Sequence, residues 1–191
     1  MKSLIIIYYI FTVFWLFVPF RQYRTRFFLP FLLLALSDPI YIAFYELVPV
    51  KTDDYYLVMS IIFLYLMMFD VKTKTRIGVV IFFVLTSIPF FMISNLSTEI
   101  LTLVIHAVIF IVLLRILAVH FSLHRNILIF HLVLVIYEFT LLLKFFVSIT
   151  NVEVGAVYYI VTSYIQILFA IFFLIINENS KPKISFEKQA A

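Results

Sequence analysis

Residue types that often determine chemistry or packing are absent or scarce in this chain. The sequence contains no cysteine, which excludes disulfides, thiol catalysis and cysteine-ligated metal sites. Only 13% of its residues are charged, whereas a soluble domain has roughly 25%. It contains two glycines, Gly78 and Gly155, although glycine is common where membrane helices cross closely. Helix packing must therefore depend on Ala, Ser, Thr and aromatic side chains.

The remaining composition is dominated by apolar side chains. Of the 191 residues, 65% are hydrophobic, and these include 24 Phe and 12 Tyr. A soluble fold of this length cannot bury so much apolar surface, because its own surface demands more polar residues. The composition therefore predicts an all-α polytopic protein in a lipid bilayer, since no segment alternates like a barrel strand. The net charge of +4 comes from short loops, so no nucleic-acid partner is expected.

Seven apolar segments are expected to be transmembrane helices. A straight crossing needs about 20 residues, so 55–69 is short, but without it the basic loop at 70–76 would lie on the wrong side. Basic residues follow the first segment, so we expect a retained helix and not a cleaved signal peptide. The segments are 4–20, 27–48, 55–69, 77–93, 99–119, 127–147 and 156–176. They form one domain, 1–176, followed by a short polar cytoplasmic tail, 177–191.

Basic residues between the segments predict the orientation. Cytoplasmic loops of membrane proteins are enriched in Lys and Arg. One side of this chain has only Lys2 and Lys51, so we expect the N-terminus outside and the C-terminus inside, in a bacterial inner (plasma) membrane. The basic residues on the other side are Arg21, Arg24, Arg26, Lys72, Lys74, Arg76, Arg125, Lys181, Lys183 and Lys188.

The seven segments divide into three, one and three, which allows a parallel internal repeat. Residues 55–62 (YYLVMSII) and 158–165 (YYIVTSYI) match at five of eight positions, and an offset of 100 aligns Asp38 with Glu138. A composition dominated by a few apolar residue types also produces such matches by chance, so both explanations stay open. The layout resembles that of the sugar-carrier and PQ-loop proteins, but Pro39 has no counterpart in the second half and membership is not inferred.

Polar side chains lie deep within several expected spans. At 1.5 Å per residue, Asp38, Glu138 and Gln166 lie about 15–17 Å from the start of their segments, near the middle of a ~30 Å core. A charge at this depth is costly and usually faces protein or water. We expect these three residues and His106 to form one polar cluster that binds a ligand or a proton. Tyr41 joins the cluster because it shares a helix face with Asp38.

Two further residues are secondary candidates for this site. His131 lies seven residues before Glu138 on the same face, and Arg115 lies at a similar depth on the preceding segment, where the two could meet. Arg115 and Lys144 also lie near the ends of their segments, where long basic side chains reach the interface. The structural alternative for the whole cluster is a set of hydrogen bonds that holds the helices together.

Motifs for most enzyme chemistry are missing. The sequence has no HExxH, no glycine-rich phosphate loop and no GxSxG, so an enzyme is not expected. His120 and His124 have a spacing that suits a metal, but no third ligand is near them in sequence, so no metal is expected. The last segment contains no lysine, which excludes a retinal Schiff base, and no other cofactor is indicated.

Two functions remain. The first is binding or transport of a small polar solute or cation, coupled to protons, through a polar pocket at the middle of the membrane. The alternative is a membrane sensor or signalling subunit. A tail of fifteen residues is too short to be an output domain, so a sensor would need a separate membrane protein or kinase as its partner.

Overall fold

The computed structural model describes residues 2–47, 51–68, 97–150, 156–180 and 182–185. Six α-helices are formed by these residues, which confirms the all-α prediction. They are α1 (Lys2–Arg21), α2 (Phe28–Leu47), α3 (Thr52–Met68), α5 (Thr98–His124), α6 (Ile129–Thr150) and α7 (Ala156–Ile175). The predicted segment 77–93 lies outside the described residues.

The segment after α7 folds back on the chain. It contains a short 3₁₀-helix, η1 (Glu178–Ser180), and the strand β2 (Lys183–Ser185). This strand pairs antiparallel with β1 (Asn126–Leu128), which connects α5 to α6, and Asn126 lies opposite Ser185. The first part of the expected polar tail therefore belongs to the folded structure.

The helix α5 is longer than predicted at its C-terminal end. It begins at a normal cap, because the side chain of Ser97 accepts a hydrogen bond from Ile100 N. It then continues through His124, where a loop was expected, since nothing between 120 and 124 is a helix-breaking proline or glycine. It ends at Arg125, whose left-handed backbone (φ 53°) lets its N–H donate to Phe121 O. At about 1.5 Å per residue, its 27 residues span about 40 Å.

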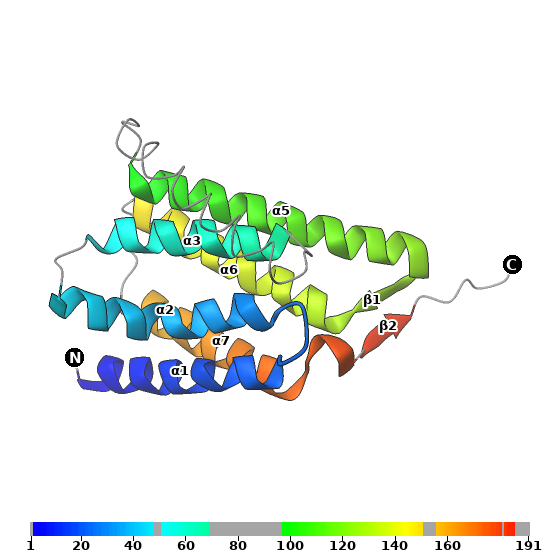
Figure 1. Ribbon diagram of the computed structural model, residues 1–191, viewed down its shortest axis with the longest axis horizontal. Helices are drawn as coiled ribbons and strands as arrows, with labels where there is room; N and C mark the ends of the chain where they lie inside the picture. The colour runs from blue at the N-terminus through cyan, green and yellow to red at the C-terminus, as the bar shows by residue number, and fades with distance from the viewer. Residues whose placement is uncertain (1, 48–50, 69–96, 151–155, 181, 186–191) are drawn as a thin grey trace, which may run out of the picture.

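The helices form two groups that run along the long axis of the molecule (Figure 1). In one group, α1 packs extensively against both α2 and α7; in the other, α5 packs extensively against both α3 and α6. The groups meet along a seam where α2 contacts α3 and α6 contacts α7, and these two contacts are less extensive. The seam is therefore the place where space can remain between the helices.

An aromatic core joins four of the helices. Phe173 of α7 is completely buried, and its ring lies 4.8 Å from Phe31 of α2 and 5.5 Å from Phe130 of α6. Trp15 of α1 lies 5.2 Å from Tyr137 of α6. Tilted and edge-on rings of this kind fill space at ring distances of about 4.5–7 Å. Aromatic shape thus supplies the packing that glycine supplies in many membrane helices.

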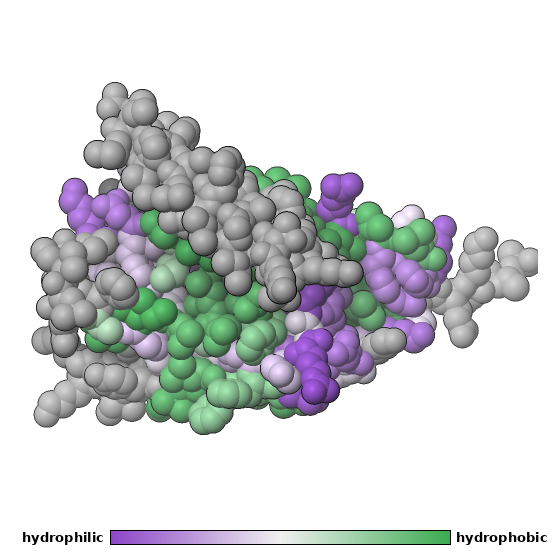
Figure 2. Space-filling view, in the orientation of Figure 1, coloured by the Kyte–Doolittle hydropathy of each residue, from purple (hydrophilic) through white to green (hydrophobic). Residues whose placement is uncertain are grey.

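The outer faces of the helices are apolar. Along α5, the exposed residues form one stripe at helical spacing: Ile100, Val104, Val108, Ile111 and Leu114. On the face seen in Figure 2, hydrophobic residues cover the centre and hydrophilic residues gather toward the two ends of the long axis. Among the described helices, α5 and α6 are long and apolar enough to cross a membrane. Such a surface is typical of a protein that contacts lipid.

Candidate functional site

A cavity of about 450 Å³ lies at the seam between the two helix groups. Residues of α2, α3, α5, α6 and α7 line it, so five helices from both parts of the chain contribute. Its volume falls in the range of about 300–1,000 Å³ that is usual for small-molecule sites. The polar lining residues are Ser37, Asp38, Tyr56, Ser60, His106, Lys144, Ser148, Ser163 and Gln166.

His106 of α5 connects the cavity to a buried carboxyl group. Its Nδ1 lies 2.6 Å from Glu138 Oε1, and its Nε2 lies 3.0 Å from Ser60 Oγ. Its ring also packs on Phe145 at 4.8 Å between ring centres. Both ring nitrogens are therefore in use, and Glu138, which is 1% exposed, lies behind His106 as seen from the cavity lining.

The hydrogen bonds around His106 define two arrangements of its protons. Ser60 Oγ lies 2.7 Å from the carbonyl oxygen of Tyr56, one turn earlier in α3, to which it donates. In that arrangement Ser60 accepts from His106 Nε2–H, and the His106–Glu138 pair holds two protons and is neutral overall. If the pair loses one proton, Nε2 becomes an acceptor and the Ser60 hydroxyl turns toward it. The Ser60 hydroxyl can thus hydrogen-bond to His106 in either arrangement.

Glu138 also has an oxygen without a partner. Its Oε2 is buried and makes no hydrogen bond to any described residue. A buried carboxylate with an unsatisfied oxygen is costly in a low-dielectric environment. Among the described residues, His106 is therefore the hydrogen-bond partner that holds this carboxyl group.

Asp38 lies on the opposite wall, in the middle of α2. Its Oδ1 accepts a hydrogen bond from the Tyr56 hydroxyl at 2.9 Å. Pro39 follows it inside the helix and has no N–H to donate to the carbonyl of Ala35, although α2 continues through this position. The carbonyl of Ser37 accepts from the Tyr55 hydroxyl at 2.6 Å. Two tyrosines of α3 therefore hold the α2 wall in place and leave Asp38 on the cavity lining.

Lys144 lies on the cavity wall and does not act as the interfacial anchor that its sequence position predicted. Its Nζ donates to Gln166 Oε1 of α7 at 3.2 Å, and both side chains line the cavity. Position along a helix does not determine which way a side chain turns around the helix axis. The cavity therefore contains an amino group as well as a carboxyl group.

The structure brings together four of the predicted site residues and separates others. Asp38, His106 and Gln166 line the cavity, and Glu138 contacts His106. Tyr41 is not among the described lining residues. Its hydroxyl lies 2.6 Å from Thr52 Oγ1, and its ring lies 5.8 Å from that of Tyr56.

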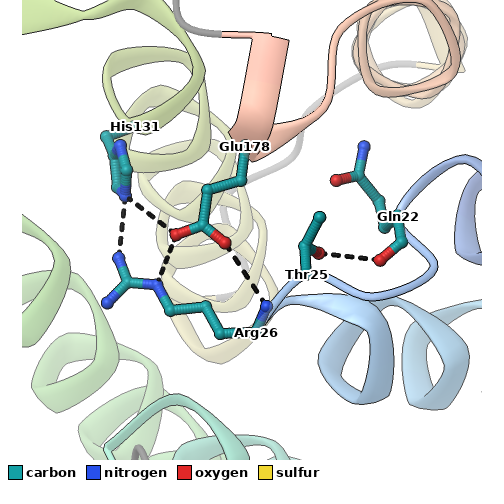
Figure 3. Close-up of polar contacts among 5 residues, drawn as sticks. All are labelled: Gln22, Thr25, Arg26, His131 and Glu178. Carbon is teal, nitrogen blue, oxygen red and sulfur yellow. Dashed lines mark hydrogen bonds and ion pairs between the residues drawn. The ribbon is translucent and has the colours of Figure 1, made fainter.

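His131 belongs to a second polar cluster, shown in Figure 3. Its Nε2 lies 2.7 Å from Arg26 Nη2, and Arg26 Nε lies 2.8 Å from Glu178 Oε1. Arg115, the predicted partner of His131, is exposed on α5, so the predicted contact is wrong. The reason is that the tail returns to α6 and brings Glu178, which orients Arg26 toward His131.

The loop that follows α1 also caps the C-terminal end of α7. The last carbonyls of a helix have no partner within the helix. Gln22, which is completely buried, donates from Nε2 to Phe173 O at 2.8 Å and to Ile176 O at 3.1 Å. Arg21 donates to Ile175 O. The loop after α1 therefore holds α7 against α1 as well as contributing positive charge.

Sequence analysis missed several polar residues of the cavity, among them Tyr56, Ser60 and Lys144. Tyr56 and Ser60 lie four residues apart on one face of α3, and both belong to the segment 55–62 that matches 158–165. That match was a usable signal, because repeated polar positions in apolar helices often line a shared site. For Lys144 the sequence offered no such signal.

Comparisons with known proteins add no relative to this description. Among the described residues, no group of three His, Asp, Glu or Cys side chains could hold a metal ion. No family model matches the chain, and no curated protein or solved structure matches it either.

Proposed function

We propose that the chain is a multi-pass membrane protein with seven helices and its N-terminus outside, which binds a small polar solute at the seam and couples its transport to protons. The observation that supports this most directly is the cavity itself, whose lining includes His106 in contact with the buried carboxyl group of Glu138. Ionisable groups buried within apolar helices commonly mark ion and proton pathways.

The helix contacts support a parallel repeat. Exchange of α1, α2 and α3 with α5, α6 and α7 converts the α1–α2 pair into α5–α6, α1–α7 into α5–α3, and α2–α3 into α6–α7. Each extensive contact exchanges with another extensive contact, and each sparse contact with the other sparse one. In many transporters the substrate site lies at the interface between two such repeats.

Part of the cavity lining follows the same repeat. At the two offsets of the sequence match, three pairs of corresponding positions both line the cavity. These pairs are Ser37 with Tyr137, Ser60 with Ser163, and Phe63 with Gln166. Movement of the two helix groups about the seam would expose such a site alternately to the two sides of the membrane.

Replacement of Glu138 with glutamine is expected to abolish proton movement without unfolding the protein. The amide Oε1 can still accept from His106 Nδ1–H, but an amide cannot take up or release a proton. The measurement is dye-reported proton uptake into proteoliposomes after addition of a mixture of sugars, amines, carboxylates and amino acids. The rate should fall to that of protein-free liposomes.

The matched control for this experiment is Glu178→Gln, which alters a carboxyl group outside the cavity. This variant should keep the wild-type rate of proton uptake. Wild-type uptake by Glu138→Gln would contradict the proposal. If the wild-type protein binds a solute and moves neither solute nor protons, the sensor alternative replaces transport.

A second candidate function is hydrolysis. Glu138 contacts His106 and His106 contacts Ser60, which is the sequence of contacts found in the catalytic triad of serine hydrolases. Against this, Ser60 Oγ donates to the Tyr56 carbonyl, and the amides of α3 around it are engaged in helical hydrogen bonds. They cannot form the oxyanion hole that acyl transfer requires. We expect a fluorophosphonate probe to leave Ser60 unlabelled, as checked by mass spectrometry of the intact protein. Labelling that disappears in Ser60→Ala would restore the hydrolase.

A further inference from the structure

Two side chains of opposite charge line different walls of the cavity. Asp38 is on α2 and Lys144 is on α6, the helices that correspond in the proposed repeat. Each is engaged by a neutral partner: Asp38 by the Tyr56 hydroxyl and Lys144 by the Gln166 amide. Each contact uses only part of the hydrogen-bonding capacity of the charged group, because a carboxylate can accept about four hydrogen bonds and an ammonium group donates three.

The cavity lining also has a large apolar part. It includes Leu33 and Leu34 of α2, Met59 and Phe63 of α3, and Leu141 and Phe145 of α6. A ligand with one charge would neutralise one wall and leave the other charge buried without a counterion, which is unfavourable in a low-dielectric site. A ligand with an amino group, a carboxylate and an apolar side chain would match all three features.

We propose that the cavity binds a small zwitterion with an apolar side chain, an amino acid of the leucine type. Its ammonium group lies against Asp38, its carboxylate against Lys144, and its side chain against the leucines and phenylalanines of the lining. This inference rests on the proposed function, since it names the class of solute for the same cavity. Tyr56 and Gln166 act as positioning residues, because they hold the two charged groups.

Four probes that differ in charge or in side chain test the proposal. L-leucine has both charges, isoamylamine has only the amine, 4-methylpentanoate has only the carboxylate, and glycine lacks the side chain. Calorimetric titration of the purified full chain in lipid nanodiscs should give the tightest binding for leucine, by at least about tenfold, which corresponds to about 1.4 kcal/mol. Equal binding of the amine or of the acid would overturn the proposal.

Two substitutions then assign each charge to its wall. Lys144→Met should lower the affinity for leucine by about tenfold or more and leave the affinity for isoamylamine within about twofold of the wild-type value. Asp38→Asn should lower the affinity for leucine by a similar factor and leave the affinity for 4-methylpentanoate nearly unchanged. Lys183→Met and Asp53→Asn are the matched controls at exposed positions, and both should bind leucine as the wild type does. Equal losses of affinity for all probes in both cavity variants would contradict the assignment of each charge to its wall.

The outcomes also separate this inference from the proposed function. If proteoliposomes show proton uptake that depends on Glu138 and leucine does not bind, the class of solute is wrong and transport stands. If neither uptake nor binding occurs in protein that elutes as one species and unfolds cooperatively, both proposals fail. Where Lys144→Met does not fold, Lys144→Gln removes the same charge and takes its place.

Discussion

Replacement of Phe173 with alanine is expected to lower the free energy of unfolding by about 3–5 kcal/mol, the usual cost of removing a buried phenylalanine from a packed core. Phe173 is completely buried and lies within ring distance of Trp15, Phe31, Phe130 and Tyr137. Few small residues are available at the crossings, so the neighbouring rings cannot easily close the gap. Thermal and denaturant unfolding in lipid bicelles would measure the loss.

The control for this prediction lies on the same helix. Leu168 of α7 is 65% exposed, so Leu168→Ala removes a large apolar side chain from the outer face. This substitution should change the free energy of unfolding by less than about 0.5 kcal/mol. Equal effects of the two substitutions would mean that the aromatic cluster does not form the core. Glutamine at Phe173 would be a poorer test, because it would add an unsatisfied amide.

Replacement of Glu138 with alanine is expected to cost about 3 kcal/mol, because it removes one member of a buried hydrogen-bonded pair and leaves the other without a partner. Glu138 is 1% exposed and His106 is 5% exposed, so water cannot replace the lost contact. The substitution His106→Ala should have a comparable effect. Unfolding of both variants under the same bicelle conditions would measure each cost.

A double-mutant cycle separates the pair from its surroundings. If the 2.6 Å contact between His106 Nδ1 and Glu138 Oε1 stabilises the fold, the double variant should be at least about 1 kcal/mol more stable than the sum of the two single losses predicts. Glu138→Gln should lose much less than Glu138→Ala, because its amide oxygen still accepts from His106. Additive losses would show that the two side chains act independently.

The polar cluster was predictable from depth because polar groups at the same level in apolar helices gain by meeting one another. Asp38, His106, Glu138 and Gln166 follow this rule. Depth does not specify rotation about the helix axis, so Lys144 was expected at the interface and lies in the cavity. Their similar depth also allowed Arg115 and His131 to meet, but Arg115 is exposed on α5.

Contacts between distant parts of the chain were the least predictable. Nothing local in the sequence of 177–185 indicates that it pairs with β1 or that Glu178 binds Arg26. Gln22 is similar, because its role depends on the end of α7, about 150 residues later. The helical class, by contrast, follows from composition alone, since apolar runs of this length satisfy their backbone hydrogen bonds as helices.

The two helix groups have a consequence for how the protein is made. Each group mixes early and late parts of the chain: α7, the last helix to be synthesised, completes the group that begins with α1 and α2. Trp15 and Phe31 therefore cannot pack against Phe173 until synthesis is almost complete. Gln22 likewise cannot bind the carbonyls of α7 before that point. Neither half of the chain contains a finished core. Assembly is thus a late step, and a nascent chain that stops before α7 would present unfilled aromatic surfaces to the membrane and to quality-control proteases.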